Sequence, residues 1–137
     1  GLAGLRIGYG LFPPDIADML MRIKMPYNVN VAAVVAVQES LKDLDYLVGR
    51  LQAIVDERNR LFQEIKKLGW LEPLPSQANF LLCQVLKGEA RRVAKELQKK
   101  GILVRFFDQP RLRNFIRISV GKPEHTDRLM KALGEIG

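Results

Sequence analysis

A long run of hydrophobic residues at helical spacing is the clearest pattern in this 137-residue sequence. From Leu44 to Leu68, apolar residues recur mostly at every third or fourth position, with charged residues between them. This spacing places the apolar side chains on one face of a helix, and Gly69 is typical of the residue that ends one. The pattern predicts one long amphipathic helix, with Asp43 or Asp45 as its candidate N-cap.

Two shorter helices are expected before the long one. The pair Pro13-Pro14 opens the first, because the fixed φ of proline suits the first helical turn. Asn28 or Asn30 can cap the second. Residues 7–11 form a short apolar run beside glycines, which predicts the end of a β-strand.

The hydrophobic period changes from helical to alternating after Gly69. The stretch LEPLPS contains two prolines and is predicted as an edge strand or a bend, whereas ANFLLCQV is a compact apolar strand. A helix over about 88–100 and the β-rich run ILVRFF follow. In the strand NFIRISV, Arg117 is expected on the face opposite three aliphatic side chains. A last helix is predicted over about 122–136.

The order of these elements predicts an α+β fold in which helices pack on a small, mostly antiparallel sheet. A chain of this length suits one ordinary domain, and its 47% hydrophobic content favours a folded body. Pro26 marks the one plausible boundary, which separates residues 1–26 from residues 27–137.

The formal net charge of +7 requires an explanation, because basic proteins often bind polyanions. Most of the cations alternate with acids on helical faces, as in DERNRLFQEIKK and GEARRVAKELQKK, which is typical of a solvated surface. No RNP-like aromatic sequence and no zinc-ligand spacing accompanies them. We therefore expect neither a nucleic-acid partner nor a bound metal. No apolar run approaches the roughly 18 to 20 residues that a membrane span needs, so no membrane partner is expected.

The single cysteine and the single histidine each have a structural interpretation. Cys83 is alone, which excludes a disulfide framework within these residues and favours a reducing, cytoplasmic compartment. It lies in the run NFLLC and is expected to be a small buried hydrophobic residue. His125 lies beside Glu124 near a predicted helix start, where it fits a solvated cap better than a general base.

Three arginines are candidates for binding anions. Arg6 follows a glycine-rich turn, where small residues such as Gly1 and Gly4 would let a bulky cofactor approach the backbone. An arginine there can hold a phosphate bidentately, or it can be a surface cation. Arg105 and Arg117 each lie among apolar strand residues, where either an anionic ligand or an ion pair with a neighbouring acid would compensate the charge.

Five segments, in chain order, carry a family resemblance: GLAGLRIGYG, PYNVN, SQANFLL, GILVR and NFIRISVGKPEHTDRLMKAL. They closely resemble the C-terminal part of histidinol-phosphate aminotransferases, which are fold-type I enzymes that use pyridoxal phosphate. The resemblance covers essentially the whole chain, and the last segment is its most specific motif. It implies that residues 1–26 are the tail of a large cofactor-binding domain and that residues 27–137 form the small C-terminal domain.

The resemblance also implies an activity for the parent enzyme. That enzyme would be a homodimer, cytoplasmic or, in a plant, plastidic, and would transfer an amino group between histidinol phosphate and 2-oxoglutarate in histidine biosynthesis. Its small-molecule substrates carry a phosphate or a carboxylate. Two alternatives stay open: a fold-type I aminotransferase for aromatic or aliphatic amino acids, and a non-catalytic α+β binding module.

Individual residues take roles from the same resemblance. Arg6 matches the arginine that holds the cofactor phosphate, and Arg117 matches the one that grips the substrate anion. Arg105 resembles the second arginine of that phosphate pocket. The family's Schiff-base lysine would fall three residues upstream of Gly1, so residues 1–137 contain no catalytic residue. We therefore expect these residues alone to be inactive as an aminotransferase.

Overall fold

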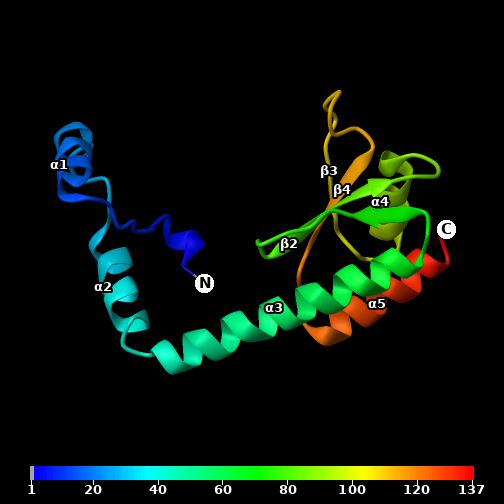
Figure 1. The fold of residues 1–137 in the computed structure, drawn as a ribbon, viewed down its shortest axis with the longest axis horizontal. Coiled ribbons are helices and arrows are strands. Elements are labelled where there is room, and N and C mark those ends of the chain that lie inside the picture. The colour runs from blue at the N-terminus through cyan, green and yellow to red at the C-terminus, as the bar shows by residue number, and fades with distance from the viewer. Residues whose placement is uncertain (1) are drawn as a thin grey trace. The chain divides into compact units, whose positions relative to one another are not determined.

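The structure is a computed structural model that describes residues 2–137. Gly1, one of the small residues predicted to lie beside a cofactor, falls outside the described residues. The chain divides into two compact units, Gly1–Gly49 and Arg50–Gly137 (Figure 1). A domain boundary at residue 26 stays a prediction.

The first unit consists of short helices. Its elements are η1 (Ala3–Leu5), α1 (Pro14–Ile23), α2 (Val31–Ser40) and the first residues of α3 (Leu44–Lys67). The prediction that the proline pair opens a helix is confirmed, because α1 begins at Pro14 directly after Pro13. Asn30 is the N-cap of α2, and its side-chain oxygen accepts a 2.8 Å hydrogen bond from the Ala33 N–H.

The strand expected at residues 7–11 is not formed. Residues 7–13 have no regular secondary structure and connect η1 to α1. A strand needs a neighbouring strand to satisfy its backbone N–H and C=O groups. No strand occurs among residues 2–49, so the apolar run has no neighbouring strand there with which its backbone could pair.

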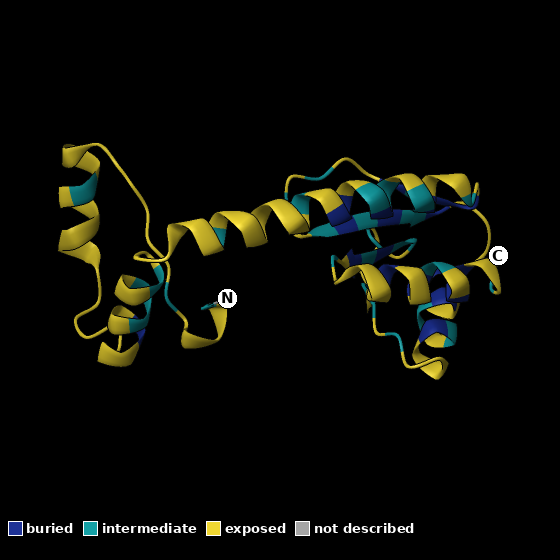
Figure 2. Cartoon of the chain, turned by 90° about the horizontal axis from the view of Figure 1, so that it is seen from below, coloured by how far each residue is buried: buried dark blue, intermediate teal, exposed yellow. Residues whose placement is uncertain are grey.

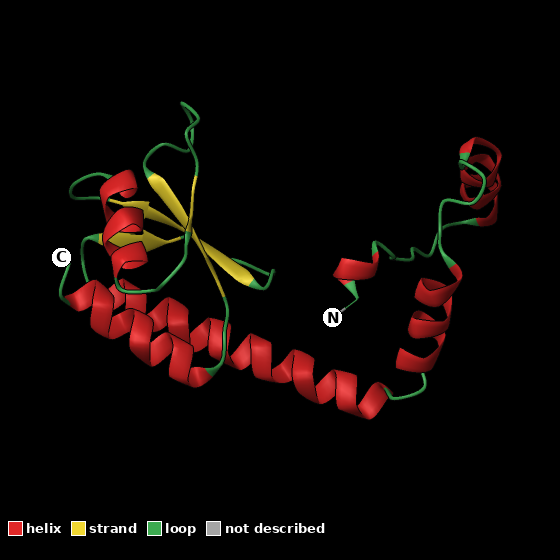
Figure 3. Cartoon of the chain, turned by 180° about the vertical axis from the view of Figure 1, so that it is seen from behind, coloured by secondary structure: helices red, strands yellow, loops and turns green. Residues whose placement is uncertain are grey.

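The second unit is a four-stranded sheet with helices packed against it (Figure 3). After the rest of α3 it contains β1 (Leu71–Pro73), β2 (Phe80–Val85), α4 (Ala90–Lys99), β3 (Arg105–Phe106), β4 (Phe115–Ser119) and α5 (Pro123–Gly134). The strand order is β1-β2-β4-β3, and every neighbouring pair is antiparallel. The predicted α+β fold with a small antiparallel sheet is confirmed.

One face of the sheet forms the core with the helices. Buried residues alternate with half-buried ones along β2 and β4, as the strand pattern predicts. The buried positions of both strands pack with apolar side chains of α3, α4 and α5, which appear dark blue in Figure 2: Leu61, Ile65, Leu81, Cys83, Val85, Val93, Leu97, Ile116, Ile118, Leu129 and Leu133. The alternate positions, which include Arg117, therefore belong to the opposite face.

The ends of the elements follow the predicted signals, with one exception. The long helix α3 ends at Lys67, before Gly69 at φ +70°, and α4 ends before Gly101 at φ +73°. β1 is an edge strand, as the prolines of LEPLPS indicate. However, β3 comprises only two of the six residues of ILVRFF. The N–H of Ile102 donates instead to the Leu97 carbonyl at the end of α4.

Arg60 links α3 to α5, the helix that follows the strand of Arg117. We call this set of contacts the Arg60 clasp. The Arg60 guanidinium donates to the Glu57 carboxylate, at 2.8 to 3.1 Å, and to Asp127 Oδ1 at 2.7 Å. It also donates to the Pro123 carbonyl at 2.8 Å. Burial of Glu57 opposes its ionisation, but hydrogen bonds from Arg60 and Thr126 outweigh burial and hold its pKa below the ordinary value.

Candidate functional site

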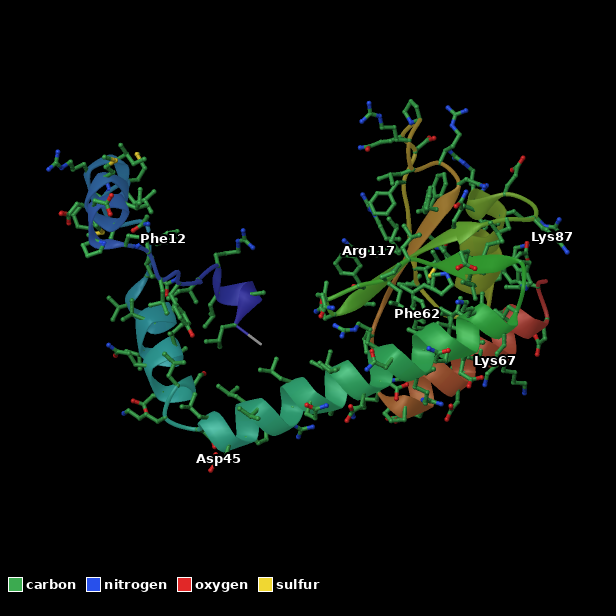
Figure 4. The ribbon with its side chains drawn as sticks, viewed as in Figure 1. Phe12, Asp45, Phe62, Lys67, Lys87 and Arg117 are labelled. Atoms are coloured by element: carbon green, nitrogen blue, oxygen red, sulfur yellow. The ribbon has the colours of Figure 1, made fainter. Side chains whose placement is uncertain are left out.

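Arg105 and Arg117 form a pair of like charges on one face of the sheet. The β3–β4 ladder places Arg105 directly opposite Arg117, and side chains of directly opposed residues emerge on the same side. That side is the one that the core helices leave uncovered, and Figure 4 labels Arg117 there. Like charges directly opposite one another destabilise a sheet, so an anion between them would be bound favourably.

The guanidinium of Arg117 has unused hydrogen-bonding capacity. Its Nε is buried and has no hydrogen-bond partner among residues 2–137, and no ion pair joins Arg117 to a described acid. Its central carbon lies 5.1 Å from the centroid of the Phe80 ring. A buried donor on a cation is costly without an acceptor. The ion-pair alternative for Arg117 thus has no support in the described part of the chain, whereas an anionic ligand would satisfy the charge.

Arg105 is exposed and also lies over an aromatic ring. Its guanidinium carbon is 5.7 Å from the Phe107 ring centroid, and no ion pair to another described residue involves it. Nearby, Arg91 is engaged differently, since it donates to Asp108 at 2.5 Å. Arg105 and Arg117 are therefore both free to turn their N–H groups toward one ligand.

Arg6 belongs to the first unit and has an unusual backbone. It is the C-cap of η1, with φ 56° and ψ 38°, and its N–H donates to the Ala3 carbonyl at 3.1 Å. Left-handed backbone at a non-glycine residue is energetically costly and is often found where function requires it. The side chain is exposed and has no partner in the described residues.

The surroundings of Arg6 leave room for a bulky group. A Cβ added at Gly4 or Gly8 would meet nothing within 4 Å. A free guanidinium beside open, glycine-bordered backbone suits a phosphate ester, so Arg6 and its neighbours fit the phosphate of a cofactor. The structure thus brings Arg105 and Arg117 together within the second unit, while Arg6 belongs to the first unit.

Cys83 and His125 have the structural roles expected of them. Cys83 is fully buried, and burial followed by the nearby charge of Glu72 raises the pKa of its thiol to about 12. His125 Nδ1 accepts a 3.3 Å hydrogen bond from the Lys122 N–H at the start of α5. Residues 2–137 contain no group of three His, Cys, Asp or Glu side chains able to hold a metal ion. None of their helices is both long and apolar enough to span a membrane.

Sequence reasoning missed the aromatic partners of the two arginines. The sequence pattern places Phe80 only in an apolar strand, although it is in phase with the half-buried positions Leu82 and Gln84. Its contact with Arg117 depends on the register between β2 and β4, which pairs Leu82 with Arg117. Phe107 lies two residues after Arg105, a spacing that could have indicated a shared face.

Comparisons with known proteins identify similar chains. The family model described as aminotransferase class I and II matches residues 1–133. A protein of Dehalococcoides mccartyi named histidinol-phosphate aminotransferase is 59% identical over 137 residues, which is 100% of this chain and 38% of the relative. A chloroplastic histidinol-phosphate aminotransferase of Nicotiana tabacum is 48% identical over 97% of this chain and 32% of its own length.

Solved structures give the same likeness. The histidinol-phosphate aminotransferase of Sinorhizobium meliloti, solved in complex with pyridoxal-5'-phosphate, has a TM-score of 0.81 and 34% identity over 99% of this chain and 38% of that one. The enzyme of that name from Clostridium acetobutylicum has a TM-score of 0.82 and 27% identity, covering 98% of this chain and 42% of that one. The chain spans 38% or less of the length of the curated relatives cited above.

Proposed function

Because the chain belongs to the aminotransferase class I and II family, we propose that it forms the C-terminal part of a histidinol-phosphate aminotransferase that uses pyridoxal phosphate. The reaction is amino transfer between histidinol phosphate and 2-oxoglutarate, as in histidine biosynthesis. The observation that carries the proposal is the pairing of Arg105 with Arg117 on the uncovered sheet face. Both substrates present an anion, a phosphate or a carboxylate, and two arginines at directly opposed strand positions suit either one.

In this proposal Arg117 is the principal anion-binding residue. Its guanidinium has no competing partner among the described residues and can bind a carboxylate or phosphate through two parallel N–H donors. Arg105 adds a second cation on the same face and favours the more highly charged phosphate. Fixing the anionic end of the substrate determines where its reacting amino or keto carbon lies, which is the chief catalytic contribution of these two residues.

Arg6 serves the cofactor rather than the substrate. Its exposed guanidinium holds the cofactor phosphate, and the open space beside Gly4 and Gly8 admits the group. When bound, pyridoxal phosphate would supply the electron sink for amino transfer. We extend the proposal to a homodimeric, cytoplasmic or plastidic enzyme in which residues 1–26 belong to the cofactor-binding domain.

A substrate comparison on the full-length protein tests the proposal. We expect the kcat/KM for histidinol phosphate to exceed that for phenylalanine by at least about 100-fold, because a site that hydrogen-bonds a phosphate discriminates strongly against a substrate without one. Arg117→Ala should remove most of this preference. Arg92→Ala, at an exposed α4 arginine without a described ion pair, is the matched control and should leave it unchanged.

Two results would favour the alternatives. Equal activity toward phenylalanine would indicate an aminotransferase for aromatic amino acids. Strong, salt-sensitive binding of RNA that Arg117→Ala leaves intact would indicate a binding module with no aminotransferase role.

A further inference from the structure

The ring of Phe80 lies beneath the guanidinium of Arg117. In the β2–β4 ladder Leu82 pairs with Arg117 and Phe80 pairs with Ser119, so Phe80 and Arg117 are diagonal neighbours on one face. The guanidinium carbon is 5.1 Å from the ring centroid, which is within the roughly 6 Å range of a cation–π contact. Phe80 itself is half-buried, so the contact is partly shielded from water.

The turn that leads into Phe80 is held by hydrogen bonds within itself, from α3 and from the residue after β4. The Ser76 hydroxyl donates to the Phe80 carbonyl at 2.7 Å and accepts from the Ala78 N–H at 3.1 Å. Arg58, a buried residue of α3, donates from Nη1 to the Ala78 carbonyl at 3.1 Å. The Val120 N–H, just beyond β4, donates to the Asn79 carbonyl at 2.9 Å. The turn before β2 is therefore tied to both α3 and the strand of Arg117.

The Arg117 guanidinium, in contrast, has no polar contact that would fix its orientation. Among residues 2–137 it forms no hydrogen bond or ion pair, and its Nε is buried without a partner. An arginine side chain has several rotatable bonds, and ordering it on ligand binding costs conformational entropy. The Phe80 ring is the contact that restricts the guanidinium before an anion arrives.

We propose that Phe80 is a positioning residue for anion binding by Arg117, acting as a rigid aromatic support that orients the guanidinium. This inference rests on the proposed function, since it requires Arg117 to bind the anionic end of the substrate. The contact restrains the guanidinium over the ring, and a carboxylate or a phosphate would supply the acceptor that it lacks among residues 2–137. Phe80 does not touch the reacting atoms, so its loss should affect binding more than turnover.

The test uses the full-length enzyme with Phe80→Leu, Phe80→Tyr and Phe115→Leu. We expect Phe80→Leu to raise the KM for histidinol phosphate and for 2-oxoglutarate by about 5- to 20-fold, with kcat changed less than about threefold. The inhibition constant of inorganic phosphate should rise by a similar factor. Phe80→Tyr keeps the ring and should stay within about twofold of the original enzyme. Phe115 shares the Arg117 face of β4 but has no cation–π contact to it, so Phe115→Leu should leave KM unchanged.

The outcomes separate this inference from the proposed function. If Arg117→Ala raises KM strongly while Phe80→Leu does not, the positioning role is overturned and the function stands. If Arg117→Ala leaves KM unchanged, the anion site itself is misassigned and the inference falls with it. Should Phe80→Leu prove unstable in thermal unfolding, Phe80→Met, which nearly conserves volume, replaces it. Unchanged phosphate inhibition and KM in Phe80→Met would then overturn the role.

Discussion

Arg117 of β4 lies directly opposite Arg105 of β3, so the sheet holds two positive charges side by side on its uncovered face. Such a pair costs roughly 0.2 to 1 kcal/mol in the absence of an anion. A bound anion would offset the repulsion between the two arginines, because each guanidinium can donate charge-assisted hydrogen bonds to it. The proposed anion site therefore links the stability of the second unit to anion binding.

This link predicts opposite effects of one substitution in two buffers. Without a multivalent anion, Arg105→Gln should raise the free energy of unfolding of the chain by up to about 1 kcal/mol, because the like charge is removed. In phosphate at matched ionic strength, the original chain should gain stability through binding, and Arg105→Gln should gain less. Urea unfolding in phosphate and in chloride measures both effects. Arg92→Gln is the control, and an equal gain in phosphate for all three chains would contradict the prediction.

The role of Arg6 predicts a loss of cofactor affinity in the full-length protein. Arg6→Ala should weaken pyridoxal phosphate binding by about 10- to 100-fold, because charge-assisted hydrogen bonds contribute roughly 1.5 to 3 kcal/mol. Absorbance titration with the cofactor measures this change. Arg22→Ala, at an exposed α1 arginine, is the matched control.

A second variant separates the Arg6 side chain from its strained backbone. Arg6→Gly removes the guanidinium but accepts φ 56° without cost. It should bind the cofactor as weakly as Arg6→Ala while unfolding at a higher denaturant concentration. Recovery of affinity in Arg6→Gly would mean that the backbone turn, not the guanidinium, holds the phosphate.

Local patterns predicted the elements of the second unit because each pattern there reflects burial against one core. The alternation around Arg117 gave its face correctly, and the position of Gly69 gave the end of α3 within two residues. The pairing of Arg105 with Arg117 was out of reach, because register between strands depends on contacts distant in sequence. For the same reason, the sequence does not indicate that Phe80 contacts Arg117.

The strand predicted at residues 7–11, in contrast, does not form. An apolar run beside glycines has the composition of a strand, but composition does not supply a hydrogen-bonding neighbour. None of the residues described before Gly49 forms one. The role of Arg6 likewise rests on family resemblance, since neither charge nor spacing distinguishes a phosphate anchor from a surface cation.

The Arg60 clasp predicts a pH-dependent contribution to stability. Glu57 is 7% exposed, so Glu57→Gln leaves Arg60 with a weaker partner and should lower the free energy of unfolding by roughly 1 to 2 kcal/mol at pH 7. Because the folded-state pKa of Glu57 is lowered, the contribution is full above the unfolded pKa of about 4.3 and disappears as pH falls through the folded value. Denaturant unfolding at pH 7, 5 and 3.5 follows the loss.

An exposed pair on the same helix is the control for this clasp. Glu64 contacts Lys67 at 2.6 Å, but the lysine is largely solvated, so Glu64→Gln should cost less than about 0.5 kcal/mol at any pH. A constant difference between the original chain and Glu57→Gln down to pH 3.5 would show that the carboxylate charge is not what Arg60 recognises.

Cys83 should be inert in the folded chain. Its thiol is fully buried, and its pKa of about 12 leaves almost no thiolate at pH 8. Iodoacetamide should therefore modify it only after denaturation, as mass spectrometry can record. Cys83→Ser should destabilise the chain by about 1 to 3 kcal/mol, since a hydroxyl without a partner replaces a thiol in the core, and Cys83→Ala should cost less. Rapid labelling of the native chain would contradict the buried assignment.

The apolar surface of α1 predicts self-association of residues 1–137. Ile16, Met19 and Ile23 share one face of α1 and are 40%, 62% and 77% exposed, and Phe12 precedes them at 55%. Neighbouring exposed apolar groups of this kind mark a surface that another body normally covers. We expect sedimentation velocity to detect dimers or larger species at micromolar concentration, together with binding of a hydrophobic dye. Met19→Glu with Ile23→Glu should reduce both signals, whereas Leu103→Glu, at an 80% exposed residue of the second unit, should change them little. A monomer that binds no dye would contradict this prediction and show that the exposed apolar face of α1 is stable in water.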